Sequence, residues 1–484
     1  YGGATLDTIE QVNQMFGVQN GFPRFMQFTH VVRNEKTARN YVERLKAVGV
    51  KFDQVIGVVR KQAGMGDVPP TFVIDKVVAE MKGLIAAPAR ENPLYTVYVD
   101  SLKKVDMAEE DRARLAADAE TAIADTVYPA YQRLIAAMED LRSQSTPDAG
   151  IWKQTQGEEY YALALRQQTT TDLTPQQVHD IGLAEVARIT AEMDAILIAQ
   201  GMSEGTVGAR MKALGEDPKY HFEDSDKGRQ DILDEYTRLL AEVKAKLPEA
   251  FERIPPQELE VVRVPKFSET GSAGAYYNPP SLDGSRPGRF FANLRDVKET
   301  PKWSMKTLAY HEGIPGHHYQ IATAQNLDLP LARSNLPFTA YTEGWALYAE
   351  RLAWEMGMYK DDPLGDLGRL QAELFRAVRL VVDTGMHYKK WSREQAIAYM
   401  VETTGMAESD VTSEIERYAV MPGQACAYKI GMLKILELRD RAKTALGPKF
   451  DLRKFHSAVL DNGALPLTVL ESVIDQWIAE QKGA

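Results

Sequence analysis

Apolar residues recur at steps of three and four positions over most of this 484-residue chain, which is the pattern of amphipathic helices. Residues of high helix propensity, such as Ala, Leu, Glu and Lys, are frequent in the same stretches. Helices are predicted at 108–143 (with a kink at Pro129), after Thr174-Pro175, and at 228–246, 302–325, 338–357, 364–390, 393–402, 408–419, 424–444 and 466–481. The chain therefore predicts a mainly α fold.

One region, between residues 257 and 296, interrupts the helical pattern. It holds three short segments rich in Val, Tyr and Phe, which are typical of strands, at 258–264, 273–278 and 289–293. Turn-forming pairs separate them, at Pro279-Pro280, Asp283-Gly284 and Pro287-Gly288. We therefore expect a small antiparallel β-ribbon near 257–296.

Composition excludes several classes of protein. The 57 basic and 68 acidic residues give a net charge of −11, which argues against a nucleic-acid-binding protein. No apolar run approaches the roughly 20 residues of a membrane helix, so no transmembrane segment is predicted. A single cysteine, Cys426, excludes an intramolecular disulfide and is compatible with both the cytoplasm and the bacterial periplasm. The start at Tyr1 rather than Met indicates processing or truncation, and favours a periplasmic or cell-envelope location.

Three of the eight histidines lie close together, at His311, His317 and His318. Glu312 follows the first of them. A His-Glu pair with a second His on the same helix is typical of zinc hydrolases, in which both imidazoles bind the metal and the Glu acts as general base. The usual spacing is H-E-x-x-H, whereas here the second His comes six or seven residues after the first.

This wider spacing leaves two candidates for the second ligand. On an ideal helix His318 shares the face of His311 but lies about 10.5 Å along the axis, and His317 is turned about 120° from that face. Pro315 and Gly316 interrupt the span, however, and a widened turn there would bring His317 beneath His311. We therefore favour His317, with His318 as the alternative.

A third ligand is expected from a downstream helix. Glu343 lies 26 residues after His317, at the start of an apolar helical run, where a carboxylate is costly unless it is paired or bound to a metal. Glu350 lies seven residues further on, and we expect it to accept a hydrogen bond from a ligand imidazole. The predicted cofactor is Zn²⁺, bound by His311, His317 and Glu343.

The segments 310–319 and 342–350 resemble a large, mostly bacterial family of proteins of unknown function, many of them described as lipoproteins. Further similar stretches are 273–280, 383–391 and 422–431. The family in turn resembles the gluzincin metallopeptidases related to angiotensin-converting enzyme, thimet oligopeptidase and carboxypeptidase Taq. The resemblance implies a large helical zincin-like fold with a deep cleft, zinc at its floor and peptide substrates.

Other residues are candidates for supporting roles. Peptide hydrolysis needs a donor for the developing oxyanion, and Tyr428 and His387 are the candidates. Arg379 shares a helical face with Asp383 and His387, and is predicted to bind a substrate carboxylate. The alternative for Arg379, Asp383 and His387 is a structural ladder between helices. The alternative for Tyr428 is an ordinary position in the hydrophobic core.

Substrate contacts are also expected from the strand region. Tyr276 and Tyr277 are predicted to present a strand edge to the peptide, and His318 to contact substrate if it does not bind the metal.

Together these features predict a zinc metallopeptidase that cleaves short peptides. A zinc hydrolase of a non-peptide amide or ester, and a non-catalytic envelope protein with a structural metal site, are the alternatives. Residues 1–150 are expected to form a helical region that supplies one wall of the cleft, and 151–484 the helical catalytic region, within one continuous unit. The sequence indicates no particular oligomeric state.

Overall fold

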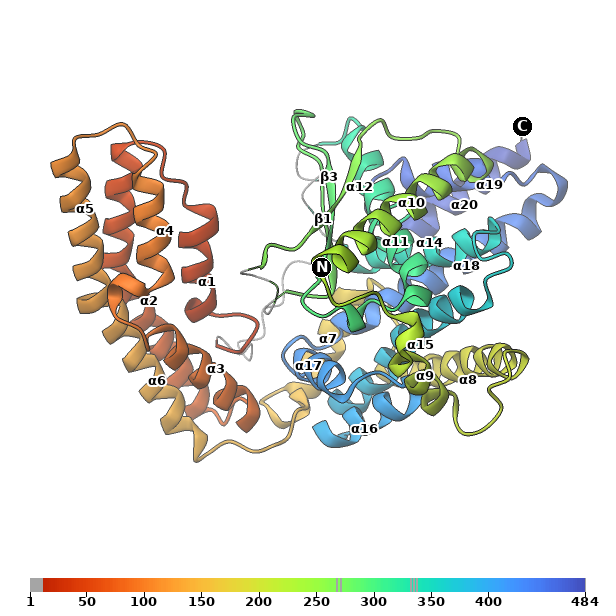
Figure 1. The fold of residues 1–484 in the computed structure, drawn as a ribbon. Helices are drawn as coiled ribbons and strands as arrows, with labels where there is room; N and C mark the ends of the chain where they lie inside the picture. Colours follow the sequence, from red (N-terminus) through yellow and green to blue (C-terminus); the bar gives the residue numbers. More distant parts are fainter. Residues whose placement is uncertain are drawn as a thin grey trace. The chain divides into compact units, whose positions relative to one another are not determined.

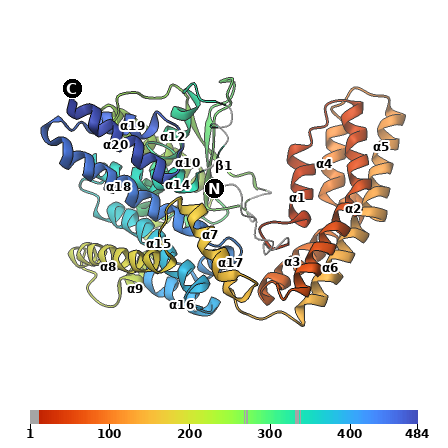
Figure 2. The same ribbon diagram turned by 180° about the vertical axis from the view of Figure 1, so that it is seen from behind.

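The computed structural model describes residues 12–483, except 267, 268, 270, 271, 331, 332, 334, 335 and 337. About 71% of the chain is helix and 3% is strand, which confirms the mainly α fold. The chain divides into two compact units, Tyr1–Tyr160 and Tyr161–Ala484, each seen from opposite sides in Figure 1 and Figure 2. Within the described residues, no helix combines the length and apolar character needed to span a membrane.

The first unit is a helical bundle. Its helices are α1 (Val18–Arg24), α2 (Glu35–Gly64), α3 (Thr71–Leu84), α4 (Pro93–Leu102), α5 (Glu109–Ala122) and α6 (Tyr128–Arg142). Helix α2 begins at a capping box, in which the Asn34 side chain accepts a hydrogen bond from the Thr37 backbone. A π-helical turn (Ile123–Val127) joins α5 to α6 just before Pro129, where a kink was predicted.

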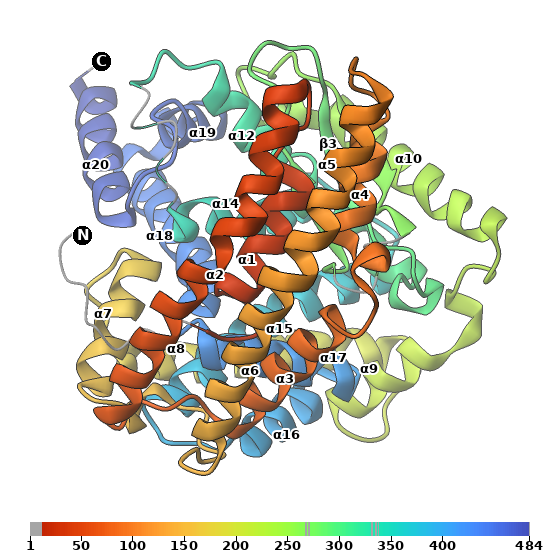
Figure 3. The ribbon, with the colours of Figure 1, turned by 90° about the vertical axis from the view of Figure 1, so that its left-hand side faces the viewer.

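The second unit is built around α15 (Pro363–His387), whose last three turns are buried almost throughout. The other helices are α7 (Gly157–Thr169, which spans the boundary), α8 (Pro175–Ala199), α9 (Val207–Glu216), α10 (Asp226–Ala250), α11 (Met305–Glu312), α12 (His317–Gln325), α14 (Thr339–Glu355), α16 (Arg393–Thr404), α17 (Glu408–Val420), α18 (Ala427–Leu446), α19 (Leu452–Leu460) and α20 (Leu467–Gly483). Helix α15 packs along α8, and α14 along α18. Figure 3 shows the whole chain from a third direction.

Three short strands form one sheet in the order β1-β3-β2. They are β1 (Leu259–Arg263), β2 (Ala275–Asn278) and β3 (Gly288–Ala292). Strands β2 and β3 pair antiparallel, as expected for neighbours joined by a turn at Asp283-Gly284. The prediction of a purely antiparallel ribbon was wrong, because β1 takes the free edge of β3 and runs parallel to it. The sheet is mixed, and β2 contacts α11.

Candidate metal centre

The histidine-rich segment forms two helices rather than the single helix with a widened turn that the sequence predicted. Helix α11 ends at Glu312, α12 begins at His317, and residues 313–316 join them. A Cβ on Gly316 would lie 2.0 Å from the carbonyl oxygen of His311. A Cβ on Gly313 would lie 2.5 Å from a methyl carbon of Leu240. This sharp reversal therefore requires glycine at both ends of the loop.

The loop brings the His317 ring against the His311 ring, with centroids 4.8 Å apart and planes at 89°. Trp345 of α14 fixes the loop, since its Nε1 donates a hydrogen bond to the Pro315 carbonyl oxygen at 2.9 Å. Trp345 lies two residues after Glu343, so the same helix that anchors the loop also delivers the expected third ligand.

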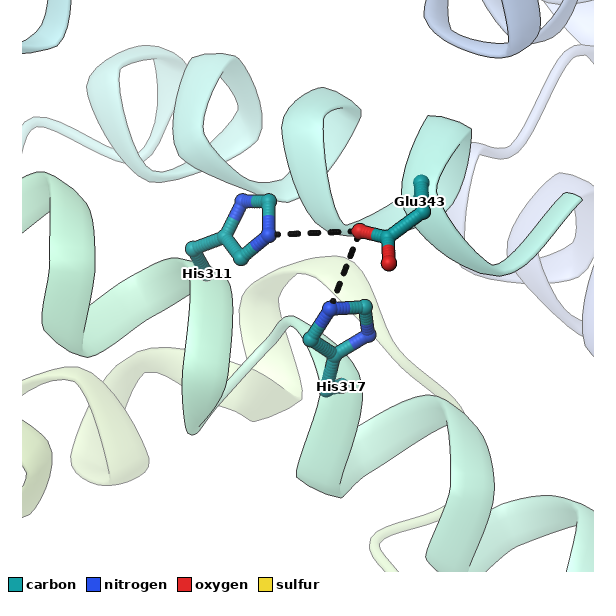
Figure 4. Close-up of side chains that lie close together, drawn as sticks. All are labelled: His311, His317 and Glu343. Atoms are coloured by element: carbon teal, nitrogen blue, oxygen red, sulfur yellow. Dashed lines mark ion pairs between the residues drawn. The ribbon is translucent and has the colours of Figure 1, made fainter. Parts of the chain in front are cut away.

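Figure 4 shows how the three side chains converge. Glu343 Oε2 lies 3.5 Å from His311 Nε2 and 3.2 Å from His317 Nε2. The three ligand atoms all lie within 4.8 Å of one another. Three ligands at bonds of about 2.1 Å with tetrahedral angles would stand about 3.4 Å apart, so the two distances from Glu343 to the imidazoles are those of a zinc site.

Glu350 supports the first of these ligands, as the sequence predicted. His311 Nδ1 donates to Glu350 Oε1 at 2.7 Å, and Thr307, one turn earlier on α11, donates to the other carboxylate oxygen. With Nδ1 directed at Glu350, the Nε2 side of the ring faces Glu343, where a bound metal ion would take the place of the Nε2 proton. Burial lowers the pKa of His311, but the hydrogen bonds to Glu343 and Glu350 outweigh it and raise the pKa to about 9. Metal-bound imidazoles are commonly held by a carboxylate in this way.

The surroundings of Glu343 stabilise its negatively charged form, as expected for a carboxylate that binds a cation. Burial raises the pKa of its carboxyl, but the neighbouring His317 and His311 outweigh burial and hold that pKa well below its usual range. Its Oε2 atom is buried and receives no well-formed hydrogen bond from the residues that the structure describes. An anionic oxygen whose nearest partners are two imidazole nitrogens, neither of them in good hydrogen-bond geometry, fits a metal ion.

His318 points to different partners from those of His317. Its Nε2 donates to the Gln257 carbonyl oxygen at 3.1 Å, and its Nδ1 accepts from the Tyr277 hydroxyl at 2.9 Å. Both ring nitrogens are therefore occupied. Gly288 on β3 leaves room for this pair, since a Cβ there would lie 2.6 Å from His318 Nδ1. Substrate contacts by His318, Tyr277 and Tyr276 stay predictions.

Glu312, the predicted general base, ends α11 beside His311. The residue is only 9% exposed. No hydrogen bond or ion pair to its carboxylate is found in the described part of the chain, and its charge contributes to the raised pKa of the buried Tyr236. A carboxylate that lies beside a candidate ligand and has no partner of its own is free to exchange a proton with a bound molecule.

Tyr428 approaches this centre from α18. Helices α14 and α18 touch where two glycines meet: a Cβ on Gly431 would lie 1.9 Å from the Ala340 carbonyl oxygen, and one on Gly344 would lie 2.5 Å from Gly431. Burial raises the pKa of Tyr428, Glu343 raises it further, and Arg379 opposes both. The phenol therefore lies within electrostatic reach of the ligand carboxylate.

Arg379 and His387 are both on α15, but their partners differ. Arg379 donates from Nε to the Tyr418 hydroxyl at 2.8 Å and from Nη2 to Glu414 at 3.0 Å. His387 is fully buried, lies outside the three-residue cluster and donates from Nε2 to the Tyr418 carbonyl oxygen at 3.0 Å. Its role as an oxyanion donor stays a prediction.

Asp383, on the same face of α15, accepts from the Tyr161 hydroxyl at 2.7 Å.

Sequence reasoning missed four residues that build this region: Thr307, Trp345, Glu414 and Tyr418. Thr307 precedes His311 by four positions, so helical spacing alone indicated that it shares the ligand's face. Trp345 is on α14, whereas Glu414 and Tyr418 are both on α17, and no pattern within the sequence linked them to the histidines.

Comparison with known proteins gives a family and a fold. The model of a family described as "Bacterial protein of unknown function (DUF885)" matches residues 3–474. A structure named a putative lipoprotein from Colwellia psychrerythraea is 46% identical with a TM-score of 0.92, covering 97% of this chain and 80% of that one. A putative lipoprotein of unknown function from Shewanella oneidensis is 18% identical with a TM-score of 0.75, covering 94% and 81%.

A third structure, named a putative oligoendopeptidase F from Bacillus anthracis, is 14% identical and covers 98% of this chain and 87% of that one. Its TM-score of 0.35 is too low to bear on fold or activity. No curated protein sequence matches the chain.

Proposed function

The chain belongs to the DUF885 family of bacterial proteins of unknown function, and for this member we propose a zinc-dependent metallopeptidase activity on short peptides. The observation that carries the proposal is the His311–His317–Glu343 cluster, with Glu312 beside its first ligand and without a partner among the residues that the structure describes. Two imidazoles and one carboxylate are the ligand set of gluzincin-type hydrolases.

The number of ligands favours a catalytic over a structural metal. Structural zinc sites are closed by four protein ligands, whereas catalytic sites have three and leave a position for water. Among the described residues, only His311, His317 and Glu343 form such a group. When bound there, Zn²⁺ would lower the pKa of a coordinated water and polarise a substrate carbonyl.

The chain's own residues then have distinct roles. Glu312 takes the proton of the attacking water and passes it to the leaving amine, because it is adjacent to a ligand and its carboxylate has no competing partner within the described chain. Tyr428 donates a hydrogen bond to the carbonyl oxygen as negative charge develops on it. Glu350 and Thr307 hold the His311 ring in the tautomer that leaves Nε2 free.

We also propose a cell-envelope location. The similar chain from Colwellia psychrerythraea, 46% identical over nearly all of this one, is named a lipoprotein.

The test of the activity is Glu312→Gln, which keeps the size of the side chain and removes the base. Zinc content, measured by elemental analysis, is expected to stay near one ion per chain, while turnover of a mixed peptide library falls about a hundred- to ten-thousandfold. Glu258→Gln is the matched control, since Glu258 is exposed and its carboxylate lies 3.4 Å from Lys244. A Glu312→Gln chain that hydrolyses peptides at the wild-type rate would show that this mechanism is wrong.

A further inference from the structure

Three arginine side chains gather around aromatic rings next to the metal centre. Arg376 and Arg379, one turn apart on α15, lie 5.4 Å and 4.2 Å from the centre of the Phe375 ring. Arg379 also lies 4.6 Å from the centre of the Tyr428 ring. Arg417 of α17 lies 4.7 Å from the Tyr418 ring, whose hydroxyl accepts from Arg379. We call these three side chains the arginine cluster.

The positive charge of the arginine cluster is not balanced by carboxylates. Glu414 accepts from Arg379 at 3.0 Å and from Arg417 at 2.8 Å, so one carboxylate serves two guanidinium groups. No other ion pair to the three arginines is found among the residues that the structure describes. Three positive charges therefore face one negative charge in a setting that is largely screened from water.

Two donors in the arginine cluster lack acceptors. Arg379 is 6% exposed, and its Nη1 is buried and makes no hydrogen bond within the described chain. The same holds for Nε of Arg376. Leaving a buried charged donor unsatisfied is costly, and an anion bound beside Phe375 would remove that cost.

The arginine cluster adjoins the proposed catalytic residues. Tyr428 contacts Arg379, and the charge of Glu343 helps to raise the pKa of the Tyr428 phenol. The charge of Arg376 opposes the rise in the pKa of His311. Both Arg376 and Tyr428 are only half-buried, so part of each residue is accessible to solvent. An anionic group attached to a substrate at the metal centre is therefore within reach of these arginines.

We infer that the arginine cluster binds the C-terminal carboxylate of the peptide, so that the chain acts as a peptidase at the C-terminal end of short substrates. The inference rests on the proposed function for its substrate class. Every unmodified peptide carries this group, and a carboxylate matches the planar donors of guanidinium. The side-chain carboxylate of an Asp or Glu residue has the same chemistry, and the experiment separates the two.

Binding is measured by calorimetry on the zinc-loaded Glu312→Gln chain, which prevents turnover. The probes are N-acetyl-Ala-Ala, its C-terminal amide and the amide of N-acetyl-Asp-Ala. We expect the free acid to bind about ten- to a hundredfold more tightly than either amide, as is typical of a charge-assisted hydrogen bond. Hydrolysis of tetra-alanine and its amide by the wild-type chain is measured in parallel.

Three variants assign the preference to the arginine cluster. In Arg379→Gln and in the half-buried Arg376→Gln, the ratio of acid to amide binding is expected to fall toward one. Arg369→Gln is the matched control: Arg369 is on the same helix with a side chain 6% exposed, against 7% for Arg379, but it is paired with Asp366 and Glu373. Its ratio is expected to stay at the wild-type value.

Equal binding of the acid and the amide would overturn the inference, even if the chain hydrolyses peptides. Equal binding of N-acetyl-Ala-Ala and the Asp-containing amide would overturn the assignment to the C-terminus. A clear preference for the acid without any hydrolysis of tetra-alanine would support the carboxylate site and contradict the proposed peptidase activity.

Discussion

His317 and His318 are adjacent in the sequence but have different chemical surroundings. His317 Nε2 faces Glu343 at 3.2 Å, whereas His318 uses both nitrogens for Tyr277 and Gln257. Burial lowers the pKa of His318, although its hydrogen bond to Gln257 opposes this, so its ring stays neutral and able to accept from Tyr277. Of the two rings, only that of His317 faces His311 and Glu343.

This difference gives a prediction in which two neighbouring variants act as controls for each other. His317→Ala removes one of three ligands and is expected to reduce bound zinc to a small fraction of one ion per chain. His318→Ala is expected to retain zinc, because it removes only the contacts to the strand region. Elemental analysis after dialysis checks both. Retention of zinc by His317→Ala together with its loss in His318→Ala would show that His318 binds the metal and His317 does not.

The sequence was informative about residue types at the site and less so about their geometry. Glu350 was predicted as a partner of a ligand ring from its position seven residues after Glu343, and the structure confirms that contact. The choice between His317 and His318 was left open, because ideal helical spacing satisfies neither. The backbone reversal between Gly313 and Gly316 turns His317 toward His311 and Glu343, and the close approach of Gly313 to Leu240 of α10 is a contact that no local pattern contains.

At the scale of elements, the distance between α14 and α18 places Tyr428 near the ligand Glu343. Gly344 and Gly431 lie at the point of contact, and a Cβ on Gly431 would lie 1.9 Å from the backbone oxygen of Ala340. A backbone atom cannot turn away as a flexible side chain can. Any larger residue at position 431 must therefore push the two helices apart.

We accordingly expect Gly431→Ala to lower the free energy of unfolding by about 3 kcal/mol, near the upper end for overpacked cores. Zinc affinity and peptide turnover are expected to fall with it. The control is Gly215→Ala on α9, where a Cβ meets no atom within 4 Å and the substitution is expected to stabilise by about 0.5–1 kcal/mol. Urea unfolding of both variants measures the difference. A Gly431→Ala chain as stable as the wild type would show that α14 and α18 can move apart at little cost.

Element types were predictable because helical and strand periodicities are local properties, as at the capping box of Thr174 and Gln177 that begins α8. The direction of strand pairing was not. The composition of segment 258–264 predicts a strand but does not indicate which strand it pairs with. The parallel pairing of β1 with β3 follows from the path of the chain between them. The break between α11 and α12 was likewise underestimated, since a Pro-Gly pair signals distortion without giving its size.

At the scale of the molecule, all three proposed ligands and their supporting residues belong to one unit, Tyr161–Ala484. The ligands come from α11, α12 and α14, which are separate in the sequence and meet only in the folded chain. The expectation that residues 1–150 supply one wall of a cleft stays a prediction, because amphipathic patterns show which faces of helices are apolar and not which faces of two units meet.

A metal that binds only the folded arrangement stabilises it by mass action, by about 2.7 kcal/mol when free zinc is at a hundred times its dissociation constant. Because the ligands lie in one unit, this stabilisation is expected to be local. Removal of zinc with a chelator should increase amide hydrogen exchange in residues 305–325 and 339–355, while residues 35–142 of the first unit keep their protection.

The His311→Ala chain is the control for effects of the chelator itself, since it lacks a ligand and its exchange is expected to be the same with and without chelator. Exchange measured by mass spectrometry on peptide fragments resolves the two units within one sample. An increase confined to residues 35–142, or no change at 305–325, would contradict the placement of the metal between α11, α12 and α14. Because hydrogen exchange reports binding without turnover, this result tests the metal centre independently of whether the substrate is a peptide.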